Sequence, residues 1–254
     1  MRSSDLQAIY VMWLRQIKRF IRARSRLVAN IAQPFFFLAI LGFGFSSARF
    51  PGIPIKLTYI DFIAPGIITM AVIFSSMFAG ISVIWDRQFG FLQEVLVAPV
   101  SRISIVIGRT LGGSTTAIIQ GLIILAISMI LGVKISVLGL LPALIFMILT
   151  AFMSVSFGIL IASRMEDIHG FQLIMNLLLM PLVFLSTAFF PIEGLPNWLK
   201  YVVYANPLTY SVDGIRGCLI GASYFPLTLD FIVIVGLCAI MMGLGAYSFS
   251  KCEV

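Results

Sequence analysis

The chain has 254 residues, of which 60% are hydrophobic and only 11% are charged. Soluble domains are usually about one-quarter charged, so a chain this poor in charge, with a mean hydropathy of +1.09, does not cover itself with a solvated surface. Several apolar runs approach or exceed the roughly 20 residues that a helix needs to cross a bilayer, whereas a membrane barrel shows alternating segments of about ten residues. These observations predict an all-α polytopic membrane protein.

The formal net charge of +7 does not predict nucleic-acid binding, because the densest group of basic residues lies directly before the first apolar run. Basic residues beside a span are typical of membrane orientation and of contact with anionic lipid. The three cysteines include no CxxC pair and show no metal-ligand spacing, so no bound metal or cofactor is expected. A cleavable signal peptide is not expected either, because no short apolar run ends in a small-residue cleavage site.

In chain order, residues 5–27 are expected to form an amphipathic helix on the membrane surface, because apolar residues recur there at helical spacing among basic ones. The alternative is a basic, disordered tail. Six transmembrane helices are expected to follow, with approximate bounds 27–45, 62–85, 108–131, 137–162, 170–190 and 229–249. The domain plan is therefore a cytoplasmic interfacial helix over residues 1–26 and a six-span transmembrane domain over residues 27–254.

Positive charges predict the orientation of these spans. Six spans place both termini on one side of the membrane, and 12 of the 17 Lys and Arg residues then lie on that side. Because positive residues favour the cytoplasmic side, both termini are expected in the cytoplasm. The chain is thus predicted to be a multi-pass protein of the cell membrane.

The polar stretch WDRQFGFLQEVLVAPVSR separates the second expected span from the third. In it, Phe89, Leu92 and Leu96 recur at helical spacing. Pro99 disfavours a helix at the residue before it, and Ser101 is a candidate cap for the next helix. The pattern predicts a short interfacial helix followed by a restart, and a plain cytoplasmic linker is an equal alternative.

The segment 191–226, between the fifth and sixth expected spans, is too apolar for a solvated connection of its length. Pro196 and Pro207 each stand where a first helical turn tolerates proline, and Asn206 is a candidate cap. We therefore expect two short helices that dip into the membrane from outside, with approximate bounds 196–205 and 207–220. The alternative is a seventh, broken span, which would place the C-terminus outside.

Polar residues within the expected spans are few. Ser75, Ser76 and Asn176 fit either helix–helix hydrogen bonding or a modestly polar wall of a translocation path. Asp213 and Arg216 lie three residues apart and are expected to pair on one helix face. Almost no carboxylate lies mid-span, which disfavours a proton-driven transporter.

The sequence also argues against catalysis by this chain. It contains no GxxxxGK[ST] motif, and a phosphate cradle needs both the glycine-rich turn and its lysine. An intramembrane enzyme needs a nucleophile with a base, or clustered His and carboxylates, and the chain has a single His. A channel needs charged or polar rings along a pore. An intramembrane enzyme and an ATP-independent channel are therefore both disfavoured.

Two motifs carry a family resemblance. GFLQEVLVAPVSR resembles the loop signature of the ATP-binding-cassette (ABC) type-2 permeases, at Gly90, Leu92, Leu96, Pro99, Ser101 and Arg102. FFPIEGLPNWLKYVVYANPLTYSVDGIRG resembles the family's extracellular segment, at Phe190, Pro191, Leu195, Pro196, Trp198, Asn206, Pro207, Leu208, Thr209, Tyr210, Asp213 and Arg216. The chain is most similar to drug-resistance and nodulation-factor export permeases. It departs from many members at Phe91 and Gln93, where they carry Thr and Glu.

The resemblance implies the permease subunit of an ABC exporter, which moves an amphipathic, drug-like, lipid or glycan-type substrate outward. ATP and Mg²⁺ are expected on a separate cytoplasmic ABC ATPase subunit, and no cofactor is expected on this chain. A second permease copy is the other expected partner, with a homodimer favoured over a heterodimer. Contact with membrane lipid is expected, and contact with nucleic acid is not.

The resemblance also implies roles for particular residues. Residues 86–102 correspond to a coupling loop seated on the ATPase, with the N-terminal helix beside it, and the candidate contacts are Asp86, Arg87, Phe89, Gly90, Phe91, Leu92, Glu94, Leu96 and Pro99. The candidate residues of an extracellular gate in the re-entrant segment are Trp198, Asn206, Pro207, Tyr210, Asp213 and Arg216. The candidate pathway residues are Ser75, Ser76 and Asn176, on a path lined by the first, second and fifth spans.

Overall fold

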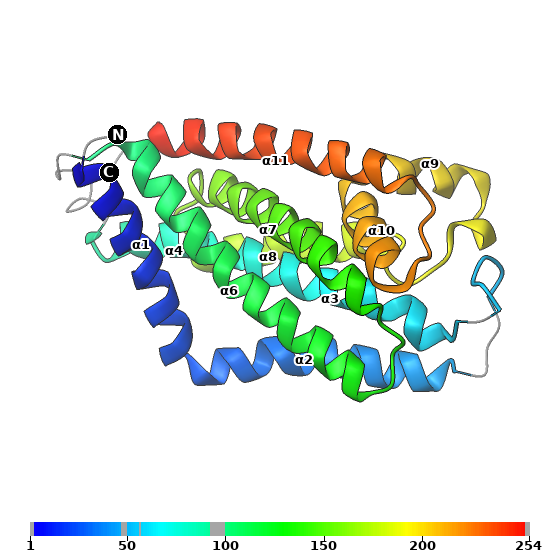
Figure 1. The fold of residues 1–254 in the computed structure, drawn as a ribbon. Coiled ribbons are helices and arrows are strands. Elements are labelled where there is room, and N and C mark those ends of the chain that lie inside the picture. Colours follow the sequence, from blue (N-terminus) through cyan, green and yellow to red (C-terminus); the bar gives the residue numbers. More distant parts are fainter. Residues whose placement is uncertain (1–2, 47–49, 56, 92–99, 252–254) are drawn as a thin grey trace.

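The computed structural model describes residues 3–46, 50–55, 57–91 and 100–251, and within these ranges the chain consists of helices and turns. Figure 1 shows an elongated bundle with α11 and α2 on opposite sides and α6 and α7 between them. α1 lies at the end of the bundle where α11 finishes, and the short α9 lies at the far end. The elements are α1 (Ser3–Arg22), α2 (Arg24–Gly44), α3 (Tyr59–Ala79), α4 (Ile81–Gln88), α6 (Arg102–Ile130), the 3₁₀ helix η1 (Val137–Gly139), α7 (Leu140–Ala162), α8 (Ile168–Phe184), the 3₁₀ helix η2 (Ile192–Gly194), α9 (Asn197–Ala205), α10 (Pro207–Ile220) and α11 (Leu227–Ser250).

The predicted class, an all-α polytopic membrane protein, is confirmed. In the described part of the chain, five helical segments are long and apolar enough to cross a bilayer. Their bounds are Leu27–Gly44, Tyr59–Gln88, Arg102–Ile130, Val137–Ala162 and Leu227–Ser250. They correspond in order to the first, second, third, fourth and sixth spans expected from the sequence.

The remaining expected span, residues 170–190, corresponds to the shorter apolar helix α8, which has 17 residues and ends at Phe184. Its end lies earlier than predicted because the chain turns and packs back on α3. Gly66 of α3 makes this packing possible, since a Cβ there would lie only 2.5 Å from the carbonyl oxygen of Ala188. The Tyr59 hydroxyl of α3 donates a 3.0 Å hydrogen bond to the Phe189 carbonyl, which holds the turn against α3.

α3 is the central helix of the bundle, and most of its residues are buried. It passes into α4 at Gly80, where the two helices meet with only a local change in the hydrogen-bond ladder. Gly80 packs directly on the backbone of α7, and a Cβ there would lie 2.5 Å from the Gly158 carbonyl carbon. The small residues therefore let α3 and α7 approach backbone to backbone, as in other membrane helix pairs.

Side-chain caps begin several helices, among them α6 and α8. The Ser101 side chain accepts from the Ser104 amide at 3.0 Å, so the prediction that Ser101 caps the next helix is confirmed. At α8, the Asp167 carboxylate accepts from the backbone amides of Gly170 at 2.6 Å and His169 at 3.1 Å. These two hydrogen bonds hold the pKa of Asp167 below its ordinary value.

The segment after α8 contains the two short helices expected from the sequence, α9 and α10, and they meet at Asn206. The Asn206 side chain accepts from the Leu208 amide at 3.0 Å and donates to the Leu182 carbonyl at 2.6 Å. It therefore caps α10, as predicted, and also ties α10 to α8. α10 ends at Ile220, and the next residue, Gly221, has a positive φ of 71°, a conformation that favours glycine.

Candidate functional site

The N-terminal helix α1 packs closely against α6. Glycine residues of α6 allow the approach: a Cβ at Gly108 would lie 2.8 Å from the Ile9 carbonyl oxygen, and one at Gly112 would lie 2.6 Å from the Gln16 Cβ. The Trp13 indole donates to the Thr115 hydroxyl of α6 at 3.1 Å. The predicted N-terminal helix thus forms, and it is an integral part of this end of the bundle.

A buried ion-pair network joins α1, α4 and α6. Its centre is Asp86 of α4, which is only 1% exposed. Both carboxylate oxygens accept from the Arg15 guanidinium, at 2.7 and 2.5 Å, and Arg109 Nη2 lies 2.7 Å from Oδ2. Arg19 completes the network at 3.7 Å. One carboxylate therefore holds three guanidinium groups, two from α1 and one from α6.

Aromatic rings cover this network. The Arg15 guanidinium lies 3.8 Å from the centre of the Phe91 ring, and Arg19 lies 5.0 Å from the centre of the Trp85 ring. Such cation–π contacts strengthen when water is excluded. The network is thus partly shielded from solvent, which strengthens its ion pairs.

The end of α4 is also tied to the turn between α7 and α8. Arg87 donates to the carbonyl oxygens of Ser163 and Met165, at 3.2 and 3.4 Å, and the Gln88 side chain donates to the Glu166 carbonyl at 2.9 Å. α4 is therefore held from both sides, by α1 and α6 through Asp86 and by the α7–α8 turn through Arg87.

The residues proposed to contact an ATPase differ in where the structure places them. Asp86 is buried in the ion-pair network. Its carboxylate therefore pairs with arginines of the same chain and is not the surface contact for an ATPase that the sequence predicts. Phe89, by contrast, is 81% exposed, and Gly90 follows it with a positive φ of 74°. Phe91 packs under Arg15. Leu92, Glu94, Leu96 and Pro99 lie outside the described residues.

A groove of about 560 Å³, which we call the polar groove, lies between α2 and α8 with α3 as its floor. Five of its lining residues carry amides: Asn30, Gln33, Gln120, Gln172 and Asn176. The remaining lining residues are Pro34, Met70, Ala71, Phe74, Ser75, Phe78 and Met180. α2, α3 and α8 correspond to the first, second and fifth expected spans, which the sequence predicts to line a translocation path.

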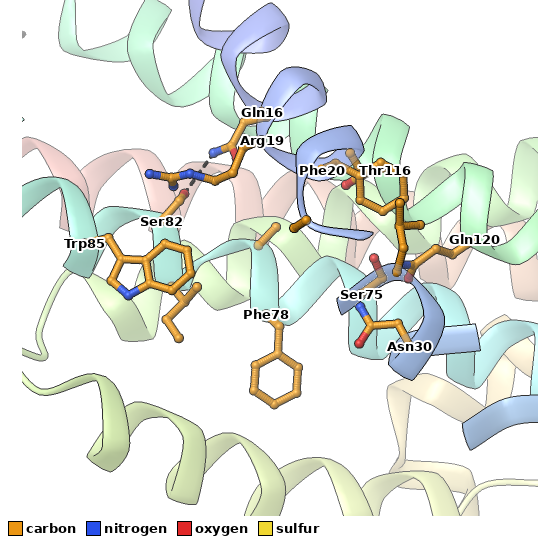
Figure 2. Close-up of a pocket in the computed structure, with 14 residues that line it drawn as sticks. Gln16, Arg19, Phe20, Asn30, Ser75, Phe78, Ser82, Trp85, Thr116 and Gln120 are labelled. Carbon is orange, nitrogen blue, oxygen red and sulfur yellow. Dashed lines mark hydrogen bonds between the residues drawn. The ribbon is translucent and has the colours of Figure 1, made fainter. Parts of the chain in front are cut away.

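The polar groove continues into a smaller pocket of about 70 Å³ beside α1, and the two share Asn30, Ser75, Phe78 and Gln120. Figure 2 shows that Asn30, Ser75 and Gln120 gather at one end of this pocket. Arg19 and Trp85 stand at its other end (Figure 2). The pocket therefore connects the ion-pair region with the polar groove.

Of the three predicted pathway residues, the structure places two in the polar groove. Ser75 and Asn176 line it, whereas Ser76 is fully buried away from it. Sequence reasoning missed Asn30, Gln33 and Gln172 as members of the same site. Gln172 stands four residues before Asn176, so the two share one face of α8, and this spacing is the signal that could have found it.

The opposite end of the bundle contains a second buried ion pair. Asp213 Oδ1 lies 3.8 Å from Arg216 Nη1, which confirms the predicted pairing, and both side chains are fully buried. Asp213 also accepts from the backbone amides of Tyr224 and Phe225. Arg216 donates to the carbonyl oxygens of Phe62 and Thr187. The pair thus joins α10 to α3 and to the chain before α11.

The other residues proposed for an extracellular gate lie around this end. Trp198 of α9 is exposed, and the Tyr210 hydroxyl donates to the Tyr204 carbonyl at 2.8 Å. Pro207 is the first residue of α10. Within the described residues no group of three or more His, Cys, Asp or Glu side chains is arranged to hold a metal ion.

The long apolar helices, the buried ion pairs at both ends and the polar groove between them define a polytopic membrane protein with a polar recess along its spans. Residues 7–220 match the family described as ABC-2 type transporter. The chain belongs to this family. The chain is therefore a membrane permease subunit of an ABC transporter.

Similarity to individual relatives extends over most of the chain. It is 30% identical to a protein of Cyanophora paradoxa named "Putative transport permease ycf38" over 213 residues, which cover 83% of this chain and 73% of that protein. It is 27% identical to the inner membrane transport permease YadH of Escherichia coli strain K12 over 231 residues, or 90% and 89% of the two chains. It is 22% identical to a protein of Mycobacterium tuberculosis named as a probable doxorubicin resistance ABC transporter permease, DrrC, over 241 residues, or 91% and 85%.

Proposed function

We propose that this permease exports an amphipathic substrate outward, driven by ATP that a separate cytoplasmic ABC ATPase subunit hydrolyses. The observation that carries the proposal is the polar groove, because amides placed along otherwise apolar helices offer a substrate head group a path that lipid does not. The apolar residues of the same groove, including Phe74 and Phe78, suit the substrate's hydrocarbon part. A polar head and an apolar tail can thus be accommodated side by side.

Phe89, at the described end of the proposed coupling loop, supports the placement of the ATPase contact at this loop. Phe89 is 81% exposed at the end of α4, and an exposed aromatic side chain is a typical anchor in a partner's pocket. Because α4 is held by Asp86 and Arg87, force applied at Phe89 passes into α1, α6 and α7. We place the ATPase at this end and therefore both termini in the cytoplasm, in agreement with the positive-inside rule.

We further propose that two copies of the permease, as a homodimer, enclose the path. In a single chain the polar groove is open to its surroundings between α2 and α8. A second copy facing this opening would convert two grooves into one enclosed path, which a closed symmetric pair accomplishes with one interface. The apolar faces of α2 and α8 on either side of the groove are suited to that interface and to lipid.

The experiment is ATP-driven transport in reconstituted vesicles. The permease and the ABC ATPase that co-purifies with it are placed in liposomes, and the movement of a fluorescent amphiphile across the bilayer is followed with ATP and with a non-hydrolysable analogue. Movement is expected only with ATP and both subunits. ATP-independent movement by the permease alone would overturn the proposal.

A matched pair of variants tests the place of coupling. Phe89→Ala is expected to weaken ATPase binding about tenfold, because truncation of an aromatic interface anchor typically costs more than about 1 kcal/mol. Trp198→Ala removes another exposed aromatic residue at the opposite end of the bundle and is expected to leave ATPase binding unchanged. The reverse result would place the ATPase at the other end.

A further inference from the structure

Building on the proposed export function, we infer that the polar groove selects an amphiphile with an uncharged, hydroxyl-rich head group, as in a neutral glycolipid. Within the groove, Gln120 of α6 acts as a specificity-determining residue. The inference rests on three observations made over the described part of the chain: the chemical types of the lining side chains, the unpartnered Gln120 amide and the absence of ionisable side chains among the lining residues.

Among the described residues, every polar side chain that lines the polar groove is an amide or a hydroxyl. The five amides come from three helices, α2, α6 and α8, and Ser75 adds a hydroxyl from α3. Each amide offers donors and an acceptor, and a hydroxyl is both a donor and an acceptor. Sugar hydroxyl groups have the same dual character, so a hydroxyl-rich head group can satisfy several of these side chains at once.

Gln120 is the most informative of these residues. It is 1% exposed, and neither its amide nitrogen nor its amide oxygen has a hydrogen-bond partner within the described part of the chain. Buried polar groups are normally paired, because an unpaired one loses its hydrogen bonds to water without replacement. Gln120 lines both the polar groove and the adjoining pocket, where Asn30 and Ser75 lie beside it (Figure 2). A ligand hydroxyl at this junction would supply the missing partner.

The size and apolar part of the polar groove fit the same class of ligand. Its volume of about 560 Å³ lies within the range of roughly 300–1,000 Å³ that is typical of small-molecule sites. Phe74 and Phe78 present rings whose centres are 6.4 Å apart along one face of α3. Aromatic rings pack against the apolar C–H faces of sugar rings, and Met70 and Met180 provide adaptable surface for a hydrocarbon chain.

Charged head groups fit the polar groove poorly. Among the residues that the structure describes, none that lines the groove is ionisable, so a cationic amphiphile finds no carboxylate among them, and burying an unpaired charge is costly. Arg19 lines only the adjoining pocket, where it lies near Asp86 and over the Trp85 ring. Because the Arg19 guanidinium already contacts Asp86 and the Trp85 ring, it does not make the polar groove a binding site for anions.

The test uses photoactivatable amphiphiles with one alkyl chain and three different head groups: maltoside, phosphocholine and trimethylammonium. The purified permease in lipid nanodiscs is labelled with each probe over a concentration series, without ATP or ATPase. Labelled peptides are identified by mass spectrometry. The maltoside probe is expected to label groove residues of α3 and α8 at concentrations about tenfold lower than the zwitterionic phosphocholine probe or the cationic trimethylammonium probe requires.

The selectivity residue is tested with two matched variants. Gln120→Met is expected to weaken maltoside labelling of the groove about fivefold to tenfold, as loss of one or two hydrogen bonds predicts. Thr150→Val removes another buried, unpartnered polar group, on α7 outside the groove, and is expected to change labelling less than twofold. Both variants remove an unsatisfied group, so neither is expected to impair folding.

Equal labelling of the groove by a charged probe, or unchanged maltoside labelling in Gln120→Met, would overturn the inference. This outcome is separable from failure of the proposed function. Because labelling requires neither ATP nor the ATPase, it tests the head-group preference independently of whether ATP drives transport. Conversely, ATP-driven transport of a cationic amphiphile through an unlabelled groove would leave the export function intact and refute the substrate class.

Discussion

The substitution Asp86→Asn removes the negative charge that joins Arg15, Arg19 and Arg109. The asparagine has nearly the same shape, so packing changes little. What changes is electrostatic: Arg109, which is 1% exposed, loses its carboxylate partner and becomes an uncompensated buried charge. We therefore expect the protein to be destabilised mainly through Arg109.

The magnitude follows from the burial of each pair. Breaking a buried ion pair by removing one partner typically costs about 3–5 kcal/mol. The Arg15 pair adds less, because the Arg15 side chain is 29% exposed and exposed pairs contribute about 0–1 kcal/mol. Since the asparagine oxygen still accepts a hydrogen bond, we expect a loss of about 3 kcal/mol. In a domain of this size that corresponds to a fall of roughly 6–12 °C in Tm.

The assay is thermal unfolding in detergent, followed by reaction of a thiol-specific fluorophore with Cys218 and Cys238, which are free and buried in the folded chain. Glu166→Gln is the matched control, because it removes an exposed carboxylate near the same end of the bundle and is expected to leave Tm unchanged. Removing Arg109 together with Asp86 should restore part of the loss, because no buried charge is then left unpaired. An Asp86→Asn protein that unfolds at the wild-type temperature would refute the reasoning.

Three further substitutions have expected outcomes. Gly112→Leu places a side chain where even a Cβ would lie 2.6 Å from the Gln16 Cβ. It is expected to displace α1, which would be measured as faster proteolysis of the N-terminal helix. Gly243→Ala adds a methyl group in open space and is expected to leave the rate of proteolysis unchanged. Arg216→Met leaves the buried Asp213 without its partner and is expected to lower stability by about 3–5 kcal/mol, measured by the same thiol assay. Asn206→Ala removes the cap of α10 and the link to α8 and is expected to cost about 1–2 kcal/mol. A Tm equal to that of wild type in either of the last two variants would show that the contact is not stabilising.

Local sequence patterns predicted much of the fold because the decisive interactions are local. Apolar run length identified the spans. Ser101 and Asn206 were recognisable as caps because the backbone amides that they bind lie two or three residues further along the chain. The pairing of Asp213 with Arg216 was predictable for the same reason, since residues three apart on a helix share a face.

The features that sequence could not predict depend on residues far apart in the chain. Asp86 looks like a surface charge in its own segment, and its burial depends on Arg15, which stands 71 residues earlier. The end of α8 at Phe184 was missed because the apolar sequence continues beyond it, and the turn is stabilised by Gly66 and Tyr59 of another helix. The polar groove likewise draws its amides from separate helices, none of which is unusual alone.

The arrangement of α1 suggests how events at α4 reach the polar groove. Gln16 and Arg19 of α1 line the small pocket that continues into the groove, and Gln16 donates to Ser82 of α4 at 2.9 Å. Because Asp86 fixes the position of α1 relative to α4 and α6, a rotation of α4 would shift the pocket wall formed by α1. Gln120, on α6 at the junction of pocket and groove, lies next to that wall, at the entrance to the proposed substrate path. The ion-pair network therefore does more than stabilise this end of the bundle: it links the helix that carries Phe89 to the wall next to the residue we expect to recognise the substrate.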